Sequence, residues 1–335
     1  MSAPATPAAG WASRQERGSA LLVRFIVWLA LSLGRPAAHV LLYPITGYFM
    51  LFSPTARAAS QAFLSRALGR PARFRDFARH IWSFSCVVLD RVFLLAGRTG
   101  DYRIEMVGFE HLEQVLAQHR GCLLLGSHLG SFEVMRAMAD ACPARMRPLM
   151  YRVNGGTLAS LFERLNPRLA ADVIDIGGAG AMLEVYESVA RGEVVGILAD
   201  RTPAEQKHLA ADFFGTQARF PTGPFILAAV AAAPVFLFFG IRVGRRHYRL
   251  HLEPFADRIV LSREDRTDEL RHWVARYAGQ LEAFCRRYPY NWFNFFDFWE
   301  GSDGIAATNC ADAGGRRGGI AAPGPGRSPG RIVSG

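Results

Sequence analysis

The sequence is poor in lysine and cysteine and lacks close-spaced metal-ligand patterns. Lys207 is the only lysine among 39 lysines and arginines, a bias that we attribute to genomic base composition. The five cysteines include no close-spaced pair: Cys86, Cys122, Cys142, Cys285 and Cys310. This scatter indicates a reducing compartment and argues against a zinc site. No cluster of residues in the sequence implies a metal or another cofactor.

An uninterrupted apolar run of membrane-spanning length is also missing. The two most hydrophobic segments, residues 21–33 and 36–52, are interrupted by Arg24, Arg35 and His39 and stop short of the roughly 20 apolar residues of a simple span. Because Arg24 breaks the first segment, a cleaved signal peptide is not favoured. We expect an interfacial or membrane-embedded helical hairpin, ahead of a transmembrane helix.

The positive charge lies in the same part of the chain. The net charge is +10, and up to Arg98 twelve arginines face three acidic residues. Apolar segments beside arginines suit an anionic membrane surface, which attracts each nearby cation. These arginines lie among Phe25, Trp28 and leucine-rich runs rather than on a polar face, so nucleic-acid binding is not expected.

The hydrophobic pattern divides the chain into four parts. We expect disorder in residues 1–19, a membrane-associated helical region in residues 20–98, an α/β domain in residues 99–300 and a disordered tail in residues 301–335. Short apolar runs alternate with helical stretches, which predicts a mixed sheet flanked by helices, with an antiparallel hairpin near residues 244–247. The expected strands are residues 102–107, 122–126, 147–151, 173–176, 194–199, 235–241 and 248–252.

The most informative stretch joins an apolar run to a histidine and an acid. Cys122-Leu-Leu-Leu-Gly126 is followed by Ser127-His128-Leu129-Gly130-Ser131-Phe132-Glu133, and His128 alone of the nine histidines has an acid at the fifth following position. We interpret this stretch as a strand-to-helix turn that places a candidate base beside the N–H groups of a helix. The arrangement suits acyl transfer to a hydroxyl. The alternative is a surface histidine with Glu133 merely in a first helical turn.

His128 and Glu133 match the H-x-x-x-x-[DE] form of the glycerolipid acyltransferases, and the blocks that follow resemble the bacterial lipid A acyltransferases. Tyr151-Arg152 is similar to the start of their second block, and residues 191–201 resemble their turn, strand and terminal aspartate. Residues 212–215 and 220–224 resemble their phenylalanine-glycine and Thr-Gly blocks. The resemblance covers residues 20–299.

The resemblance implies roles for individual residues. His128 is expected to act as the general base, and Glu133 to hold its ring. No covalent serine intermediate is expected, because Ser127 and Ser131 lack a G-x-S-x-G context. The oxyanion is expected to face the N–H groups of residues 129–132 or an arginine. The expected substrate-binding residues are Arg152, Arg164, Asp200, Arg201, Thr222 and Gly223.

Two departures bear on the acceptor. The lipid A enzymes commonly end in a tryptophan and a basic run, whereas residues 289–299 read Pro-Tyr-Asn-Trp-Phe-Asn-Phe-Phe-Asp-Phe-Trp. Arg201 stands where those enzymes often have histidine or glutamine. The aromatic ending is similar to acyltransferases of aryl polyene and related pigment clusters, so a pigment lipid or another glycolipid is an alternative acceptor.

The resemblance implies a bacterial inner-membrane O-acyltransferase whose catalytic domain faces the cytoplasm. The donor is expected to be an acyl carrier protein or acyl-CoA, and the acceptor a lipid or glycolipid at the membrane surface. Two alternatives of other classes stay open. One is an inactive membrane adaptor of a lipid biosynthetic complex, and the other is a thioesterase-like hydrolase.

Overall fold

The computed structural model describes residues 20–135, 142, 144–150, 165–178, 180–201 and 207–299. Residues 1–19 and 301–335, for which disorder is expected, lie outside this described part. So do Arg152 and Arg164, two of the expected substrate-binding residues.

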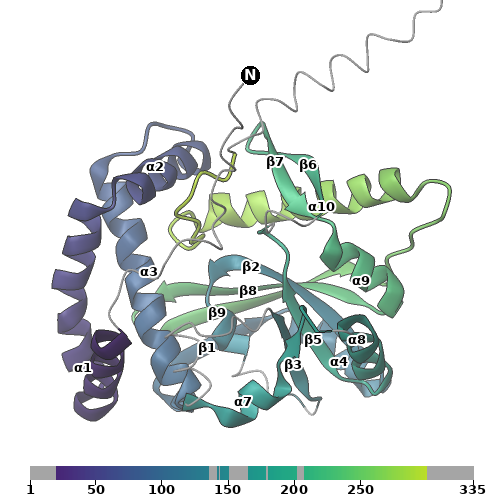
Figure 1. Cartoon of the computed structure of the whole chain (residues 1–335), viewed down its shortest axis with the longest axis horizontal. Helices are drawn as coiled ribbons and strands as arrows, with labels where there is room; N and C mark the ends of the chain where they lie inside the picture. Colours follow the sequence, from purple (N-terminus) through teal and green to yellow (C-terminus); the bar gives the residue numbers. More distant parts are fainter. Residues whose placement is uncertain are drawn as a thin grey trace, which may run out of the picture.

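A seven-stranded mixed sheet forms the centre of the molecule, in the order β1-β9-β8-β2-β5-β3-β4 (Figure 1). Its strands are β1 (Arg103–Val107), β2 (Cys122–Gly130), β3 (Met146–Met150), β4 (Ile174–Asp175), β5 (Val194–Leu198), β8 (Val235–Gly244) and β9 (His247–Ala256). Only β8 and β9 pair antiparallel, through the hairpin in which Gly244 lies opposite His247; all other neighbours are parallel. The predicted mixed α/β fold, its seven sheet strands and this hairpin are confirmed.

A second, two-stranded sheet was not predicted. β6 (His208–Phe213) and β7 (Thr216–Pro221) form an antiparallel ribbon. Phe214 and Gly215 connect them with φ angles of 60° and 73°, the left-handed values that a tight two-residue hairpin turn requires. This phenylalanine-glycine pair, which resembles part of a family motif in the sequence, therefore also forms the turn of the ribbon.

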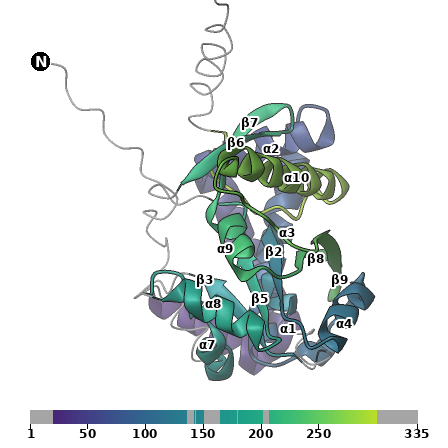
Figure 2. The same cartoon turned by 90° about the vertical axis from the view of Figure 1, so that its right-hand side faces the viewer.

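Helices cover both faces of the large sheet (Figures 1 and 2). The helices are α1 (Ala20–Phe52), α2 (Pro54–Leu68), α3 (Phe74–Leu95), α4 (Phe109–Ala117), α7 (Pro167–Asp172), α8 (Ala181–Ala190), α9 (Gly223–Ala231) and α10 (Arg266–Arg287). One apolar cluster joins the sheet to α8, α9 and α10, and a second joins the opposite face to α1, α3 and α4. The sheet is therefore the middle layer of three.

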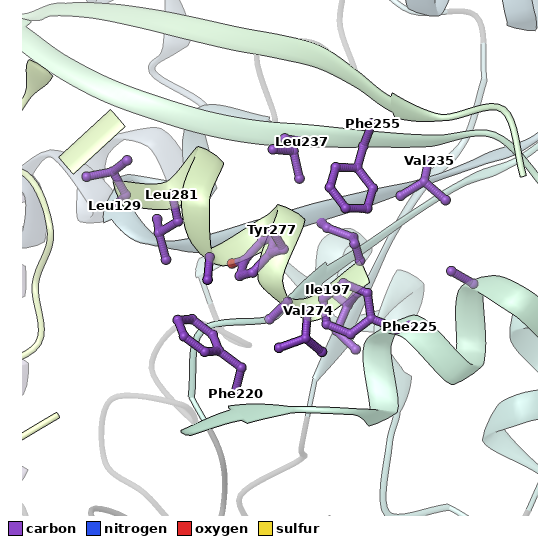
Figure 3. Packing of buried hydrophobic residues seen from close by; sticks show 14 of the residues in the cluster. Leu129, Ile197, Phe220, Phe225, Val235, Leu237, Phe255, Val274, Tyr277 and Leu281 are labelled. Atoms are coloured by element: carbon purple, nitrogen blue, oxygen red, sulfur yellow. The ribbon is translucent and has the colours of Figure 1, made fainter. Parts of the chain in front are cut away.

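Alternation along β2 supplies both layers. Leu123 and Leu125 belong to the cluster with α10, whereas Cys122 and Leu124 belong to the cluster with α3, as the two-residue period of a strand requires. All four side chains are completely buried. Figure 3 shows how Tyr277 and the neighbouring α10 residues pack against the sheet in the first cluster. Burial on both faces explains why this strand reads as a continuous apolar run.

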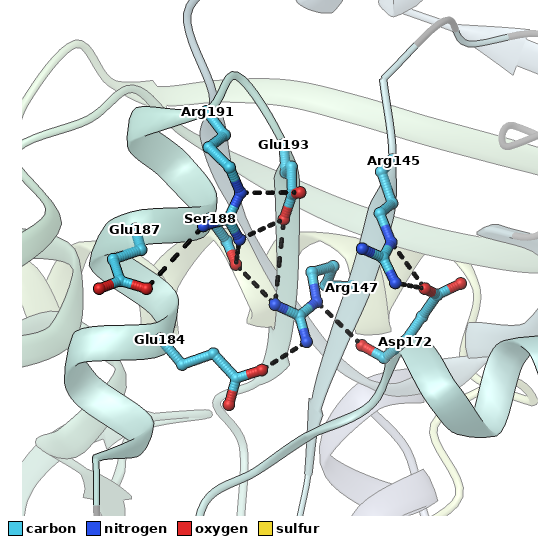
Figure 4. Close-up of polar contacts among 8 residues, drawn as sticks. All are labelled: Arg145, Arg147, Asp172, Glu184, Glu187, Ser188, Arg191 and Glu193. Atoms are coloured by element: carbon cyan, nitrogen blue, oxygen red, sulfur yellow. Dashed lines mark hydrogen bonds and ion pairs between the residues drawn. The ribbon is translucent and has the colours of Figure 1, made fainter.

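Arg147, a buried arginine of β3, joins the sheet to α8 (Figure 4). The Arg147 guanidinium donates to Ser188 Oγ at 2.8 Å, to Glu184 Oε1 at 2.5 Å and to the Asp172 carbonyl at 3.2 Å. The network satisfies the donors of a side chain that is only 8% exposed. It lies away from the residues that form the candidate site and has a structural role.

The N-terminal apolar segments form one helix that is broken at Gly34. Gly34 has non-helical backbone angles, φ 80° and ψ 173°, so the break between the two apolar runs falls where the sequence places it. The next residue, Arg35, is buried and pairs with Asp90 of α3 at 2.7 Å. Asp90 also accepts hydrogen bonds from the Tyr102 and Tyr248 hydroxyls at 3.0 and 2.8 Å. The contact ties α1 to α3 and to β9.

Replacing Asp90 is expected to destabilise the protein strongly. Asp90→Asn leaves the Arg35 cation buried without its counter-charge, which costs about 3 kcal/mol or more. Chemical denaturation of the purified protein in detergent measures this loss. The matched control is Asp268→Asn, because Asp268 pairs with Arg271 at the exposed surface and such pairs contribute about 0 to 1 kcal/mol. Equal free energies of unfolding for the two variants would show that the buried Arg35–Asp90 pair does not stabilise the attachment of α1.

Candidate active site

His128 lies within β2 rather than in a turn that leads into a helix. The strand continues to Gly130 and is followed by a short 3-10 helix, Phe132–Val134. The extension is stabilised by a distant segment of the chain. The Gly130 N–H donates to the Asn291 carbonyl at 2.7 Å, and the Phe293 N–H donates to the His128 carbonyl at 2.8 Å. The expected strand-to-helix turn is therefore wrong in its geometry.

The carboxylate that holds the His128 ring belongs to Asp200. β2 and β5 are parallel neighbours with Gly126 opposite Leu198, so His128 and Asp200, each two residues beyond this pair, lie close together at one end of the strands. The His128 Nδ1 lies 2.8 Å from Asp200 Oδ1, and the His128 backbone N–H donates to Oδ2 at 3.0 Å. Asp200, expected to bind substrate or pair internally, thus pairs with the candidate base.

Glu133 does not hold the ring, contrary to expectation. Its carboxylate forms an ion pair with Arg91 of α3 and accepts a hydrogen bond from Ser131 Oγ at 3.1 Å. The physical reason is the path of the backbone. Because residues 128–130 continue as a strand, Glu133 comes after the end of β2, where its side chain reaches Arg91 of α3 instead of the His128 ring. Glu133 still lines the pocket described below.

Four N–H groups surround the Asp200 carboxylate. Besides the ring and backbone of His128, the Trp292 indole donates to Oδ2 at 3.1 Å and the Asn294 amide donates to Oδ2 at 3.3 Å. Asp200 is completely buried, and burial alone raises the pKa of a carboxyl group. The charge and hydrogen bonds of His128, together with the charge of Arg201, outweigh burial and lower the pKa of Asp200 to about 2. Asp200 is therefore ionised at neutral pH.

The His128 ring is held in the neutral form with a free Nε2. Burial and the neighbouring Arg201 cation lower the pKa of His128, against the opposing charge of Asp200, and Arg91 adds to the lowering. Because ionised Asp200 accepts a hydrogen bond, Nδ1 carries the proton and Nε2 keeps its lone pair. Within the described residues, Nε2 has no hydrogen-bond partner, and the side chain stays 29% exposed. This is the state that a general base needs at pH 7.

Arg201 is hydrogen-bonded to the aromatic segment that also contacts Asp200. Its guanidinium donates to Asn294 Oδ1 at 2.7 Å and to the Phe293 carbonyl at 2.9 Å. Burial lowers the pKa of Arg201 to about 10, with Asp200 opposing the shift, so the side chain remains a cation. Arg201 also lies against the Phe296 ring, 5.6 Å from its centre.

A pocket of about 470 Å³ opens beside His128. Its wall combines the charged groups of the site with apolar side chains from α3 and from the aromatic segment near residue 295. The lining residues are Phe84, Val87, Val88, Arg91, Ser127, His128, Gly130, Phe132, Glu133, Leu198, Arg201, Phe293, Phe295 and Phe296. The pocket has space for an apolar chain next to a base and two arginines.

The backbone near His128 offers fewer oxyanion donors than expected. The Gly130 N–H donates to the Asn291 carbonyl, and the Ser131 N–H donates to the Gly240 carbonyl at 2.8 Å. Both groups are therefore engaged in the fold. The positive charges of Arg91 and Arg201 lie in the pocket wall instead.

Thr222 and Gly223 are not brought to this pocket. Thr222 precedes α9, and its hydroxyl donates to the Lys207 carbonyl at 3.2 Å, while Gly223 is the first residue of the helix. Both residues therefore belong to the start of α9. Arg152 and Arg164 lie outside the described residues. In the described part of the chain, no group of three His, Cys, Asp or Glu side chains is arranged to hold a metal ion.

Sequence reasoning missed Trp292, Asn294 and Arg91 as parts of the site. The aromatic segment 290–299 was noticed, but indole and amide donors to a carboxylate 92 and 94 residues away leave no local pattern. Arg91 is one of many arginines on the helical segments. Its importance follows only from the packing of α3 against the strand end.

Comparison with known families gives a match over most of the described chain. The model described as bacterial lipid A biosynthesis acyltransferase matches residues 73–300. The matched range contains His128, Asp200 and the aromatic segment that contacts both. A search of curated proteins finds no match.

The basicity of His128 can be measured directly. Diethyl pyrocarbonate acylates neutral imidazole, so the pH dependence of His128 modification, followed by peptide mass spectrometry, gives its pKa in the protein. We expect a midpoint below 6.5, and a still lower midpoint in Asp200→Asn, because that variant loses the anion that stabilises imidazolium. Exposed His272 serves as the internal control for the reagent. A midpoint above 6.5, or one that Asp200→Asn leaves unchanged, would contradict the assigned pair.

Proposed function

Because this chain belongs to the bacterial lipid A biosynthesis acyltransferase family, it is an acyltransferase that acts on a lipid, and we propose that His128 is its general base. We further propose that the donor is the thioester of an acyl carrier protein, with acyl-CoA as the alternative. The acceptor is a hydroxyl of a lipid or glycolipid. The observation that carries this proposal is the His128–Asp200 hydrogen bond of 2.8 Å at the edge of the pocket.

The proposed reaction follows from the state of the ring. Nε2 of His128 removes the hydroxyl proton as the acceptor oxygen attacks the thioester carbonyl, and a tetrahedral oxyanion forms. The oxyanion collapses, the carbon–sulfur bond breaks, and the leaving thiolate takes the proton from the imidazolium. The products are an ester and a free thiol, with no covalent enzyme intermediate. Asp200 stabilises the transient imidazolium, as the carboxylate of a hydrolase triad does.

Arginines are suited to stabilise the negative charge of the oxyanion. Arg91 and Arg201 line the pocket, and a preformed positive charge in a partly buried site lowers the energy of a developing anion. Arg201 is fixed by two hydrogen bonds to residues 293 and 294, so it needs little reorganisation during the reaction. Arg152 and Arg164 remain candidates for gripping the donor phosphate or the polar head of the acceptor.

The apolar part of the pocket suits the acyl chain. Phe84 of α3 packs against Phe293 and Phe295, with ring centres 5.4 and 5.1 Å apart, and Val87 and Val88 of the same helix also line the pocket. Such a surface removes methylene groups from water, which contributes about 0.8 kcal/mol for each buried CH₂. We propose that the acyl group of the donor lies here, with its carbonyl carbon beside His128.

We propose that α1 attaches the enzyme to the cytoplasmic surface of the inner membrane. By length and composition, residues Phe25–Phe52 could cross a membrane. Large apolar side chains point outward along the helix: Phe25, Trp28, Leu33, Val40, Tyr43, Tyr48, Leu51 and Phe52 are each more than half exposed. Because the Arg35–Asp90 pair fixes the same helix to the domain, we favour an interfacial position over a span.

The identity of the acceptor has two candidates. Family membership favours a lipid A precursor or a related lysophospholipid. The aromatic segment 289–299 replaces a basic ending, and its side chains are engaged in packing and in holding Asp200 rather than in presenting cations. That observation favours an acceptor without clustered phosphates, such as a pigment lipid of the aryl polyene type.

Lipid mass spectrometry tests the proposed reaction. Extracts are compared from cells that carry the wild-type chain, His128→Ala, a deletion, or the control His272→Ala, which changes an exposed histidine on α10. We expect one lipid to lose the mass of an acyl group in His128→Ala and in the deletion, and no change in the control. Loss of the base lowers the transfer rate by about 10²- to 10⁴-fold.

Other results would overturn the proposal. If His128→Ala matches the wild type while the deletion differs, the chain acts as an adaptor and His128 is not its base. Release of free fatty acid without any acylated lipid would indicate a thioesterase.

A further inference from the structure

We propose that residues 291–294, which we call the strap, are a positioning element of the active site, and that the Trp292 indole fixes the Asp200 carboxylate on the His128 ring. This inference rests on the proposed function. It assigns a role to the aromatic segment in which this chain departs from the basic ending of the enzymes that it resembles.

The strap pairs with β2 at His128, Leu129 and Gly130. Leu129 and Trp292 form an antiparallel bridge. The Asn291 carbonyl accepts from the Gly130 N–H at 2.7 Å, and the Phe293 N–H donates to the His128 carbonyl at 2.8 Å. These two hydrogen bonds flank Leu129, so the backbone from the His128 carbonyl to Gly130 is held by the same four-residue segment.

The two carboxylate oxygens of Asp200 have different partners: the strap side chains bind Oδ2, and the His128 ring binds Oδ1. Oδ2 accepts the Trp292 indole N–H at 3.1 Å and the Asn294 amide at 3.3 Å, together with the His128 backbone N–H. Oδ1 accepts the His128 ring at 2.8 Å. With Oδ2 occupied by fixed donors, the carboxylate cannot rotate away, and Oδ1 stays directed at Nδ1.

The N–H donors to Asp200 also affect the strength of the hydrogen bond between Asp200 and the His128 ring. Each N–H that binds the carboxylate disperses its negative charge and weakens its hold on the ring proton. Removing the Trp292 N–H therefore makes Asp200 more basic, stabilises imidazolium and raises the pKa of His128. A more basic His128 is protonated over a wider pH range and is a less available base at the acid end of the profile.

Hydrogen bonds from α3 and from β8 hold the strap in place. His80 of α3 is completely buried; its Nε2 donates to the Trp292 carbonyl at 2.8 Å, and its Nδ1 accepts from Ser60 Oγ at 2.8 Å. Burial lowers the pKa of His80 to about 4, so the ring is neutral and keeps this pattern at pH 7. On the other side, Asn291 Oδ1 accepts the Arg242 backbone N–H of β8 at 3.0 Å.

The chain supplies a matched control for Trp292. Trp299 is also buried, and its ring, like that of Trp292, packs on Phe213, with ring centres 5.9 and 5.4 Å away. Its indole N–H donates to the Phe213 carbonyl at 3.2 Å rather than to Asp200. Trp292→Phe and Trp299→Phe therefore remove similar apolar volume and one indole N–H each, and only the first changes the Asp200 carboxylate.

The test is the pH profile of acyl transfer by the purified full-length variants, with an acylated carrier protein and membrane lipid. For Trp292→Phe we expect kcat to fall about tenfold and KM to stay within about twofold, since the lost hydrogen bond is to a charged group. We also expect the acid limb of kcat/KM to move about half a unit to higher pH. Trp299→Phe should lower the melting temperature without moving that limb.

An acid limb that is the same in both variants would overturn the positioning role and leave Trp292 a core residue. If Trp292→Phe does not fold, Asn294→Ala replaces it, because Asn294 is the other strap donor to Oδ2; the limb should shift in the same direction, and an unshifted limb would again contradict the role. Absence of transfer by the wild-type chain is a different result, because it contradicts the proposed function itself.

Discussion

The buried carboxylate of Asp200 is the constraint on which the site depends. A completely buried charge is tolerated only where donors surround it, and here four N–H groups do so from two separate parts of the chain. Satisfying this charge brings the end of β2 to the end of β5 and fixes residues 291–294 beside both. The same contacts place a neutral imidazole at the edge of an apolar pocket. The hydrogen bonds that satisfy the buried Asp200 charge are thus the same ones that orient the His128 ring.

Helix α3 connects this site to the surface that we assign to the membrane. One side of the helix contributes Phe84, Val87 and Arg91 to the pocket, and another side pairs Asp90 with Arg35 of α1. The apolar side chains of α1 that point outward are therefore joined to the pocket wall through a single rigid element. A lipid acceptor at the membrane surface and an acyl chain in the pocket would both contact this helical layer.

The sequence allowed the sheet to be predicted because periodicity reports burial. The seven strands of the large sheet were expected, since runs such as Cys122 to Gly126 are apolar on both faces. The ribbon β6–β7 was not, because its turn was assigned to a family motif. The break at Gly34 was visible from the Gly-Arg-Pro sequence that separates two apolar runs.

The candidate site was predicted only in part. His128 was found from its position after an apolar strand, but the five-residue spacing to Glu133 suggested the wrong partner. The correct acid, Asp200, is 72 residues away in sequence and is brought close by the adjacency of β2 and β5. No local pattern encodes strand order, and none encodes the contact between Trp292 and Asp200. The residues that orient the proposed base depend on tertiary pairing, whereas His128 itself is marked by its local sequence.

The tautomer of His128 shows whether Asp200 holds the ring as proposed, and NMR can observe it. In protein labelled with ¹⁵N-histidine, the His128 resonances are assigned by their loss in His128→Gln and recorded at pH 7.5. We expect a protonated Nδ1 and an unprotonated Nε2, because ionised Asp200 accepts from Nδ1, and we expect Asp200→Asn to disturb this preference. A ring protonated at Nε2 alone, or a charged imidazolium at this pH, would contradict the proposed pairing.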